Sequence, residues 1–250
     1  MKTKIHSSIV TFFGLMILGC TYVSAAETSA VNPAITPIDR NELQWWKERH
    51  AAKLAEVKQK ADNVELLMIG DSITHWWEED QGSPVWNKYY ASRKPFNIGY
   101  AGDRTEHVLW RLDHGEIDGI NPKLSVMMIG TNNIGHGSST PEQTVEGVKM
   151  ILARLEQKLP ETKVLLLSVF PRGTDEHDDL RKKVNQINLG LPALADGKQV
   201  YYLDIGSKFV DENKVLPKSI MPDLLHPNTK GYEIWAEAIE PSVAKLLEDK

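Results

Sequence analysis

The 250-residue sequence is poor in cysteine, in basic residues and in long apolar runs, and each shortage narrows what the protein can be. Its one cysteine, Cys20, excludes a disulfide within the chain, and a chain of this length can bury a core without one. The net charge of -5 and the isoelectric point near 5.9 argue against nucleic-acid binding, which usually leaves a basic surface. The chain also lacks an H-E-x-x-H pattern and any cluster of cysteine and histidine, so no metal-binding motif is present.

The first 25 residues have the pattern of a secretory signal peptide. Lys2 and Lys4 are followed by a nearly apolar stretch at residues 9–18 and then by small residues up to Ala25. The apolar stretch is too short for a membrane span, which needs about 20 residues. We therefore expect cleavage after Ala25 and a secreted or periplasmic protein, with no membrane span after processing.

A second processing route starts from the same segment. Residues 17–20, Ile-Leu-Gly-Cys, resemble a bacterial lipobox, which would leave the protein lipid-anchored through Cys20. Leu18 stands where a lipobox usually has a small residue, so we favour simple cleavage. Either route takes the mature protein out of the cytoplasm.

The remaining chain is expected to hold a linker and one domain. Residues 26–38, in which Pro33 and Pro37 stand among small polar residues, predict the linker. Charged residues spaced around Trp45, Trp46 and Leu54 predict a leading helix within residues 39–60. This helix opens a single domain that we place at residues 39–250.

From residue 64 onward, short apolar runs alternate with longer helical patterns. The apolar runs predict five strands, at residues 64–69, 96–98, 124–129, 164–169 and 200–203. Helices are predicted between them and after them, at residues 104–114, 140–159, 180–195 and 228–247. Strands this apolar are covered on both faces, as in parallel sheets. The sequence therefore predicts an α/β fold, a three-layer sandwich with a five-stranded parallel sheet.

Residues with useful polar groups follow three of the predicted strands. Ser72 comes after the first strand, Gly102 after the second and Asn132 after the third. Ligands bind beyond the carboxyl ends of the strands in such sheets. A serine placed there can attack an ester if hydrogen-bond donors hold the oxyanion that forms. The backbone N–H groups of Ser72 and Gly102 and the side-chain amide of Asn132 are the expected donors.

A base for this serine is expected from the loop before the last helix. That loop contains Asp223 and His226, which are close enough in sequence for the carboxylate to turn back onto the imidazole. A carboxylate bound to one ring nitrogen fixes the tautomer and supports the charge that develops on the ring. The predicted catalytic set is therefore Ser72, His226 and Asp223.

Several neighbours of the serine have two interpretations. His75, Trp76 and Trp77 follow it closely and are expected to bind substrate, the two indoles as a platform for a sugar ring or an acyl group. Packing in the core is the alternative for both tryptophans. Asp71 and Asp103 are expected to hold their loops by accepting backbone hydrogen bonds.

Four sequence blocks resemble those of the SGNH, or GDSL, hydrolase family. They are Gly70-Asp71-Ser72, Gly102, Gly130-Thr131-Asn132 and Asp223-Leu224-Leu225-His226, and they follow the order of the family. The resemblance implies a flavodoxin-like fold, with Ser72 as nucleophile, His226 as base and Asp223 as the acid that orients the base. It also implies an oxyanion hole at Ser72, Gly102 and Asn132, and no cofactor or metal.

A closer resemblance is to the catalytic subunits of platelet-activating factor acetylhydrolase Ib, over about residues 64–247. Residues 97–105, 107–112 and 122–133 carry it, together with Pro171-Arg172-Gly173. It implies an acetyl ester as the substrate and is compatible with a homodimer. Those subunits are cytosolic and have no signal peptide, so their lipid substrate does not carry over with the resemblance.

The sequence as a whole predicts a secreted serine esterase that hydrolyses short-chain esters, chiefly acetyl esters, through an acyl-enzyme. Its expected partner is a small acylated carbohydrate, which would make it a carbohydrate O-deacetylase. A lipid-directed acetylhydrolase or lysophospholipase, acting on a lipid ester, is the first alternative. A non-catalytic binding module on the same fold is an alternative of another class.

Overall fold

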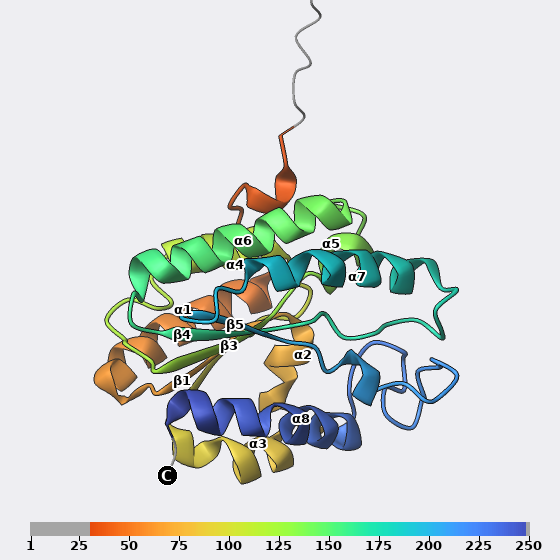
Figure 1. Ribbon diagram of the computed structural model, residues 1–250. Coiled ribbons are helices and arrows are strands. Elements are labelled where there is room, and N and C mark those ends of the chain that lie inside the picture. Colours follow the sequence, from red (N-terminus) through yellow and green to blue (C-terminus); the bar gives the residue numbers. More distant parts are fainter. Residues whose placement is uncertain (1–30, 249–250) are drawn as a thin grey trace, which may run out of the picture. The chain divides into compact units, whose positions relative to one another are not determined.

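The computed structural model describes residues 31–248 of the chain, and these form one compact unit around a parallel β-sheet (Figure 1). The sheet has the strand order β2-β1-β3-β4-β5, and every neighbouring pair is parallel. The strands are β1 (Leu66–Gly70), β2 (Pro95–Gly99), β3 (Leu124–Met128), β4 (Lys163–Leu167) and β5 (Val200–Leu203). All five predicted strands are confirmed, and this order is the flavodoxin-like one.

Both faces of the sheet are covered, which explains why the strands are so apolar. In β1, Leu67 and Ile69 belong to one core cluster while Leu66 and Met68 belong to the other, as the alternation of side chains along a strand requires. The first cluster packs under α1 (Gln44–Lys60), α4 (Thr105–Asp113), α6 (Pro141–Lys158) and α7 (Asp179–Gly190). The second packs under α3 (Ser83–Tyr89) and α8 (Thr229–Leu247). The three-layer prediction is therefore confirmed (Figure 1).

The long helices lie close to their predicted positions because their ends carry readable signals. Thr140 accepts a hydrogen bond from the backbone N–H of Gln143, whose side chain accepts one from the backbone N–H of Thr140, and Pro141 opens α6. Asn228 caps α8 through the N–H of Gly231. The leading helix begins at Gln44, inside the predicted range.

Several short elements were not predicted from the sequence. The helix expected over residues 180–195 divides after Gly190 into α7 and the 3-10 turn η5 (Leu191–Leu194). Two one-turn helices follow strand ends, α2 (Ser72–His75) after β1 and α5 (Thr131–Gly135) after β3. The other 3-10 turns are η1 (Pro33–Ile35), η2 (Ala61–Asn63), η3 (Trp76–Glu78), η4 (Ala91–Arg93) and η6 (Gly206–Lys208).

The segment expected as a linker is described from residue 31 onward, and this part packs on the domain. Ala34 in η1 is buried, and its carbonyl accepts a hydrogen bond from Thr105 Oγ1 at 2.9 Å. Asn32 Nδ2 donates to Glu146 on α6 at 2.6 Å. The expected signal peptide, with Ala25 and Cys20, lies outside the described residues. Within residues 31–248, no helix has both the length and the apolar character that crossing a membrane requires.

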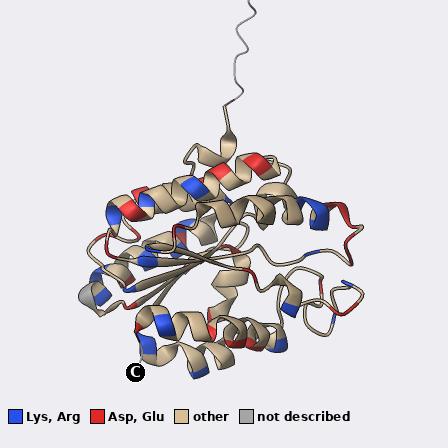
Figure 2. Ribbon diagram, in the orientation of Figure 1, with Lys and Arg blue, Asp and Glu red and all other residues tan. Residues whose placement is uncertain are grey.

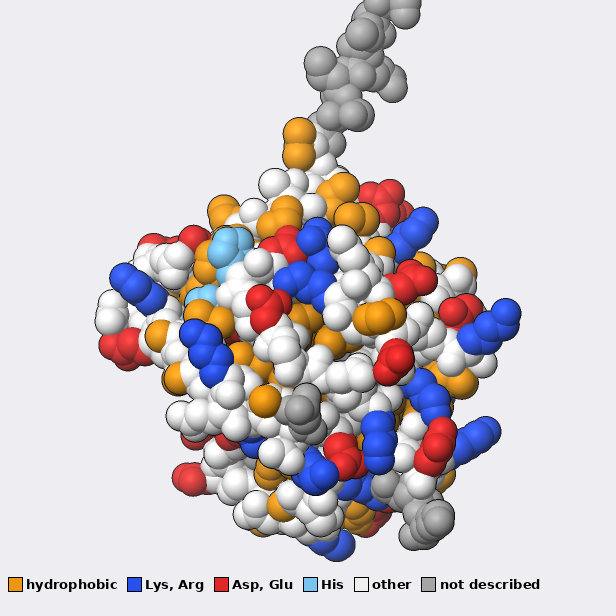
Figure 3. All heavy atoms as spheres, turned by 90° about the vertical axis from the view of Figure 1, so that its left-hand side faces the viewer, with side chains coloured by type: hydrophobic (Ala, Val, Ile, Leu, Met, Phe, Trp, Pro, Cys, Tyr) orange, Lys and Arg blue, Asp and Glu red, His pale blue; other side chains and the backbone are white. Residues whose placement is uncertain are grey.

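Acidic and basic residues are interspersed along the helices (Figure 2). The face at the amino ends of the strands shows the same mixture (Figure 3). Ion pairs at this end of the sheet include Lys94 with Glu65 and Lys163 with Glu248. The residues singled out for chemistry lie at the opposite edge, where the strands end.

The strand order identifies one place at that opposite edge. The chain moves from β1 to β2 on one side and then returns to β3 on the other side of β1. Helices diverge at such a switch point, and ligands bind in the crevice this leaves beyond the strand ends. Ser72 follows β1 and Asn132 follows β3, so these two residues flank the switch point.

Candidate active site

Ser72 is held at the start of the short helix α2. Asp71 is its N-cap, and its Oδ1 accepts the N–H of Ile73 at 3.0 Å. As the first residue of a helix, Ser72 has a backbone N–H with no carbonyl partner inside that helix. The hydroxyl and the N–H of Ser72 therefore stand together where β1 ends.

The three residues predicted as a catalytic set form one hydrogen-bonded chain. Ser72 Oγ lies 2.9 Å from His226 Nε2, and His226 Nδ1 lies 2.6 Å from Asp223 Oδ2. The fold brings Ser72 and His226 together although they are 154 positions apart in the sequence. With its Nδ1 proton directed at a carboxylate, the imidazole presents the lone pair of Nε2 to the serine hydroxyl.

The loop from Asp223 to His226 is shaped for this contact. Leu224 has φ 63°, a left-handed conformation that costs free energy in a non-glycine residue and is typical of functional loops. The turn lets Asp223 Oδ1 accept the N–H groups of Leu225 and His226 at 3.1 and 2.7 Å. Partial burial acts to raise the pKa of the Asp223 carboxyl, but these bonds and the imidazole outweigh it and lower the pKa. Asp223 is thereby kept as a carboxylate.

The predicted oxyanion donors face the same place. Asn132 Nδ2 donates one hydrogen to the carbonyl of Asp103 at 3.0 Å, which fixes the amide and leaves its second N–H for another acceptor. Gly102 has φ 74°, and a Cβ here would lie 3.0 Å from Arg40 Nη1. Both the conformation and the lack of space favour glycine. Ser72, Gly102 and Asn132 all line one cleft.

Buried side chains hold the loop that carries Gly102. The carboxylate of Asp103 accepts hydrogen bonds from Trp46 Nε1 at 2.8 Å, Arg111 Nε at 2.9 Å and Arg40 Nη1 at 3.3 Å. Its partners are thus side chains, and the expectation that it binds backbone groups was wrong, whereas Asp71 does bind one. The leading helix α1, which supplies Trp46, therefore helps to shape the loop that carries Gly102.

His75 and Trp77 were expected to bind substrate, but neither of them faces the cleft. His75 Nδ1 accepts the N–H of Ala101 at 3.3 Å, and its ring stacks on Trp45. Burial, with help from Arg49, lowers the pKa of His75 to about 4, which keeps the ring neutral for this role. Trp77 has no exposed surface and packs against Tyr232 and Trp235, so a substrate in the cleft cannot reach it.

Trp76 lies where a substrate-binding residue is expected. It lines the cleft, and its ring lies 4.1 Å from that of His226, centre to centre. The two tryptophans separate because the helical turn after Ser72 sends adjacent side chains to different sides. Trp77 therefore lies wholly in the core, whereas Trp76 lines the cleft and is partly buried against the second core cluster.

The cleft has a volume of about 300 Å³ and includes residues that sequence reasoning did not assign to the site. These are Ala101, Gly135, Arg172 and Leu225. His136 also lines the cleft, as its place after Asn132 in the sequence allows. The position of Arg172 could have been predicted from the sequence, because it follows β4 at the same edge of the sheet. An arginine there does not by itself indicate a role in the site. Within the described part of the chain, no three histidine, cysteine or acidic side chains come together as a metal site.

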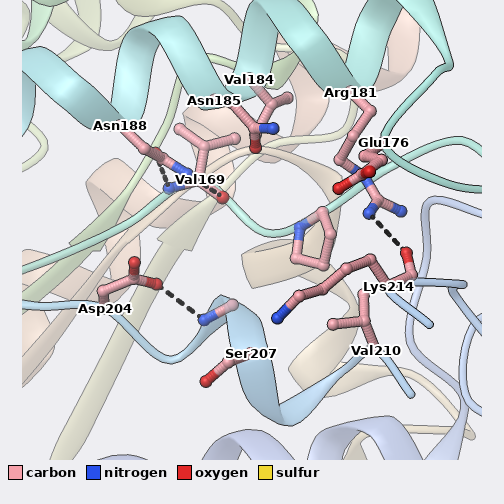
Figure 4. Close-up of a pocket in the computed structure, with 12 residues that line it drawn as sticks. Val169, Glu176, Arg181, Val184, Asn185, Asn188, Asp204, Ser207, Val210 and Lys214 are labelled. Carbon is pink, nitrogen blue, oxygen red and sulfur yellow. Dashed lines mark hydrogen bonds between the residues drawn. The ribbon is translucent and has the colours of Figure 1, made fainter. Parts of the chain in front are cut away.

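A second hollow of about 270 Å³ lies between α7 and η6 (Figure 4). Arg181 on its wall donates hydrogen bonds to the carbonyls of Arg172, Gly173 and Lys214 at 2.7, 2.9 and 3.4 Å. Figure 4 shows the bond to Lys214. Arg181 links this hollow to the cleft, because its hydrogen bonds fix the backbone that carries Arg172.

Sequence comparison relates the chain to known hydrolases. Residues 68–234 match the sequence model of the GDSL-like Lipase/Acylhydrolase family. The human platelet-activating factor acetylhydrolase IB subunit alpha1 is 33% identical over 220 residues, which cover 86% of this chain and 91% of the human subunit.

Solved structures share the fold. A GDSL-like lipase from Bacteroides thetaiotaomicron has a TM-score of 0.63 at 21% identity, covering 79% of this chain and 97% of its own. An acetylxylan esterase from Geobacillus stearothermophilus has a TM-score of 0.57 at 17% identity, covering 76% of this chain and 96% of its own.

Proposed function

Because the chain belongs to the GDSL-like lipase/acylhydrolase family and is an ester-bond hydrolase, we propose that it works as a serine esterase through Ser72. The observation that carries the proposal is the hydrogen-bonded chain Ser72–His226–Asp223 on the wall of a cleft. A non-catalytic binding module would not need a serine, a histidine and an aspartate hydrogen-bonded in series beside free oxyanion donors.

The proposed reaction has two halves. His226 Nε2 takes the proton of Ser72 Oγ as the oxygen attacks the ester carbonyl, and Asp223 stabilises the imidazolium that results. The N–H groups of Ser72 and Gly102 and the amide of Asn132 hold the oxyanion. His226 then protonates the leaving alcohol, and water, activated by the same imidazole, releases the acid from the acyl-serine.

We propose a short acyl group, chiefly acetyl. Two similar proteins support this: the human subunit is named an acetylhydrolase and the Geobacillus protein an acetylxylan esterase. The small cleft agrees with a short acyl chain.

The proposed alcohol part is a carbohydrate, and the enzyme is proposed to act outside the cytoplasm. The signal-peptide pattern of the first 25 residues supports export. Trp76 on the cleft wall gives a sugar ring a flat apolar surface to pack on. A lipid ester remains the second candidate because the human relative at 33% identity is named for platelet-activating factor.

Hydrolysis assays separate these candidates. The purified enzyme is given 4-nitrophenyl acetate, acetylated xylan, acetylated sialic acid and short-chain lysolipids, with Ser72→Ala as the blank. Release of acetate from the carbohydrates, and not from the lipids, supports the proposal. Hydrolysis of the lipids alone favours the second candidate, and no hydrolysis at high enzyme concentration contradicts the esterase proposal.

Export and assembly need separate measurements. The intact mass of the protein recovered from a bacterial host shows whether it begins after Ala25 or is lipidated at Cys20. An unprocessed chain in the cytoplasm contradicts export. Light scattering after size-exclusion chromatography tests whether the protein forms the homodimer with which the family resemblance is compatible.

A further inference from the structure

Arg172 brings a positive charge to the wall of the cleft. It follows β4, and its guanidinium is half-buried. Nη1 donates to the carbonyl of Thr131 at 3.0 Å and lies 3.1 Å from Thr131 Oγ1. Thr131 directly precedes the proposed oxyanion donor Asn132, so the guanidinium stands close to the reacting centre.

The other nitrogens of this guanidinium have no partner in the part of the chain that the structure describes. Among residues 31–248, no group accepts a hydrogen bond from Nε or Nη2 of Arg172, and no carboxylate forms an ion pair with it. Three acids exert an electrostatic effect on it, and one oxygen of each accepts a hydrogen bond from another group, although Asp71 Oδ2 has no described partner. Asp71 binds the N–H of Ile73, Asp178 caps α7, and Asp223 binds His226.

Other arginines of the described chain are satisfied differently. Six of them form ion pairs with carboxylates, namely Arg40, Arg49, Arg93, Arg104, Arg111 and Arg154. The guanidinium of Arg181 instead donates hydrogen bonds to three backbone carbonyls. Arg172 is the one of these eight that lines the cleft. Arg40 and Arg154 also bond through Nη1 alone, but each of them pairs with a carboxylate, and Arg172 does not. Half-burying a charge without a carboxylate partner costs free energy, and an anion bound in the cleft would offset that cost.

The fold makes room for the guanidinium at this place. A Cβ on Gly135, in α5, would lie 2.5 Å from Arg172 Nη1 and 3.3 Å from its Cζ. The arginine therefore occupies the space that any side chain at position 135 would need. Other basic groups add to the positive potential here, since Arg104, Arg40 and Arg172 all help burial to lower the pKa of His136 on the same cleft wall.

We propose that Arg172 binds an anionic group, a carboxylate or a phosphate, on the alcohol part of the ester substrate. The forked N–H groups of arginine match the paired oxygens of both. An acetyl group carries no charge, so the anion must belong to the alcohol. This inference rests on the proposed esterase function and narrows its substrate to acidic acetyl esters, such as acetylated uronates or sugar phosphates.

The experiment compares three sugars that differ only at carbon 6. Methyl glucoside, methyl glucuronide and methyl glucoside 6-phosphate are each supplied as their 2-, 3- and 4-O-acetyl isomers. We expect the best isomer of at least one acidic sugar to exceed the best neutral isomer in kcat/KM by about 10–100-fold, the weight of a charge-assisted hydrogen bond. The acidic sugar that is preferred identifies the anionic group.

Three variants test whether Arg172 is responsible. Arg172→Gln should bring the acidic-to-neutral ratio of kcat/KM close to one. Gly135→Ala keeps the arginine but displaces its guanidinium, and should lower the ratio as well. Arg154→Gln removes the same charge from an arginine that is paired with Asp113, and should leave the ratio unchanged.

The outcomes separate the inference from the function on which it rests. A wild-type enzyme that hydrolyses the neutral and acidic esters equally well overturns the inference and leaves the esterase proposal standing. An equal loss on all three sugars in Arg172→Gln shows that the arginine only supports Thr131, and also overturns it. If Arg172→Gln does not fold, Gly135→Ala decides. Failure to hydrolyse any ester, 4-nitrophenyl acetate included, contradicts the proposed function itself.

Discussion

Replacing Asn132 by alanine should lower kcat about 10²–10³-fold, which corresponds to about 2.7–4 kcal/mol of transition-state stabilisation. The side chain is nearly buried, and its bond to the Asp103 carbonyl at 3.0 Å leaves one N–H for the oxyanion. A donor fixed in this way needs no reorganisation when the charge forms. The loss should therefore fall on kcat and not on substrate binding alone.

The assay is the hydrolysis of 4-nitrophenyl acetate under saturating and single-turnover conditions, with thermal unfolding as the check on the fold. The neighbouring Asn133 provides a matched control. Its amide binds Thr105, Glu106 and Ser139 inside the protein, so Asn133→Ala should lower the unfolding free energy by about 1–3 kcal/mol. Its kcat should stay within about tenfold of the wild type, since no oxyanion donor is lost. A loss of only a few-fold in Asn132→Ala would remove Asn132 from the oxyanion hole.

Three further predictions concern residues around the serine. Trp77→Ala should lower the free energy of unfolding in urea by about 3–5 kcal/mol, because a large buried side chain is lost, and a change near zero would refute its place in the core. Burial raises the pKa of Asp71 from 3.8 to about 7, so the folded state holds an extra proton between these values and stability should fall as pH rises through that window. Asp71→Asn should remove this slope in unfolding measured from pH 4 to pH 8, and an unchanged slope would assign it to another group. Asp223→Asn should lower kcat about 10³–10⁴-fold in initial-rate assays, and a loss below tenfold would contradict its role as the orienting acid.

The sheet and the positions of the main site residues could be predicted because both depend on strong local signals. Apolar runs mark the strands, glycine ends or closely follows three of them, and parallel strands place their carboxyl ends at one edge. Ser72, Gly102 and Asn132 each follow a strand directly, so their meeting follows from topology. The capping signals at Thr140 and Asn228 set two helix starts for the same reason.

Side-chain direction could not be predicted in the same way. Trp76 and Trp77 are adjacent and identical, yet one lines the cleft and the other lies in the core. Both residues lie in η3, the single 3-10 turn that follows α2, and these turns are too short to leave a periodic pattern in the sequence. His75 likewise turns toward the Ala101 N–H and away from the cleft.

Long-range polar contacts were also out of reach. Trp46 binds Asp103 across 57 positions of sequence, and Arg40 reaches Ala101 across 61. Such contacts depend on how α1 and the residues before it pack against the domain. The type of a charged or aromatic residue does not indicate which distant residue it will bind. The sequence therefore could not show that residues 40–46 support the loop that carries Gly102.

The most direct test of the account is to trap the acyl-enzyme on Ser72. The wild-type enzyme is mixed with 4-nitrophenyl acetate, quenched in acid during the first turnover, digested and analysed by mass spectrometry. We expect a burst of 4-nitrophenol and one acetyl group on the peptide that contains Ser72, with both lost in Ser72→Ala. An acetyl group found on another residue, or turnover that survives in Ser72→Ala, would contradict it.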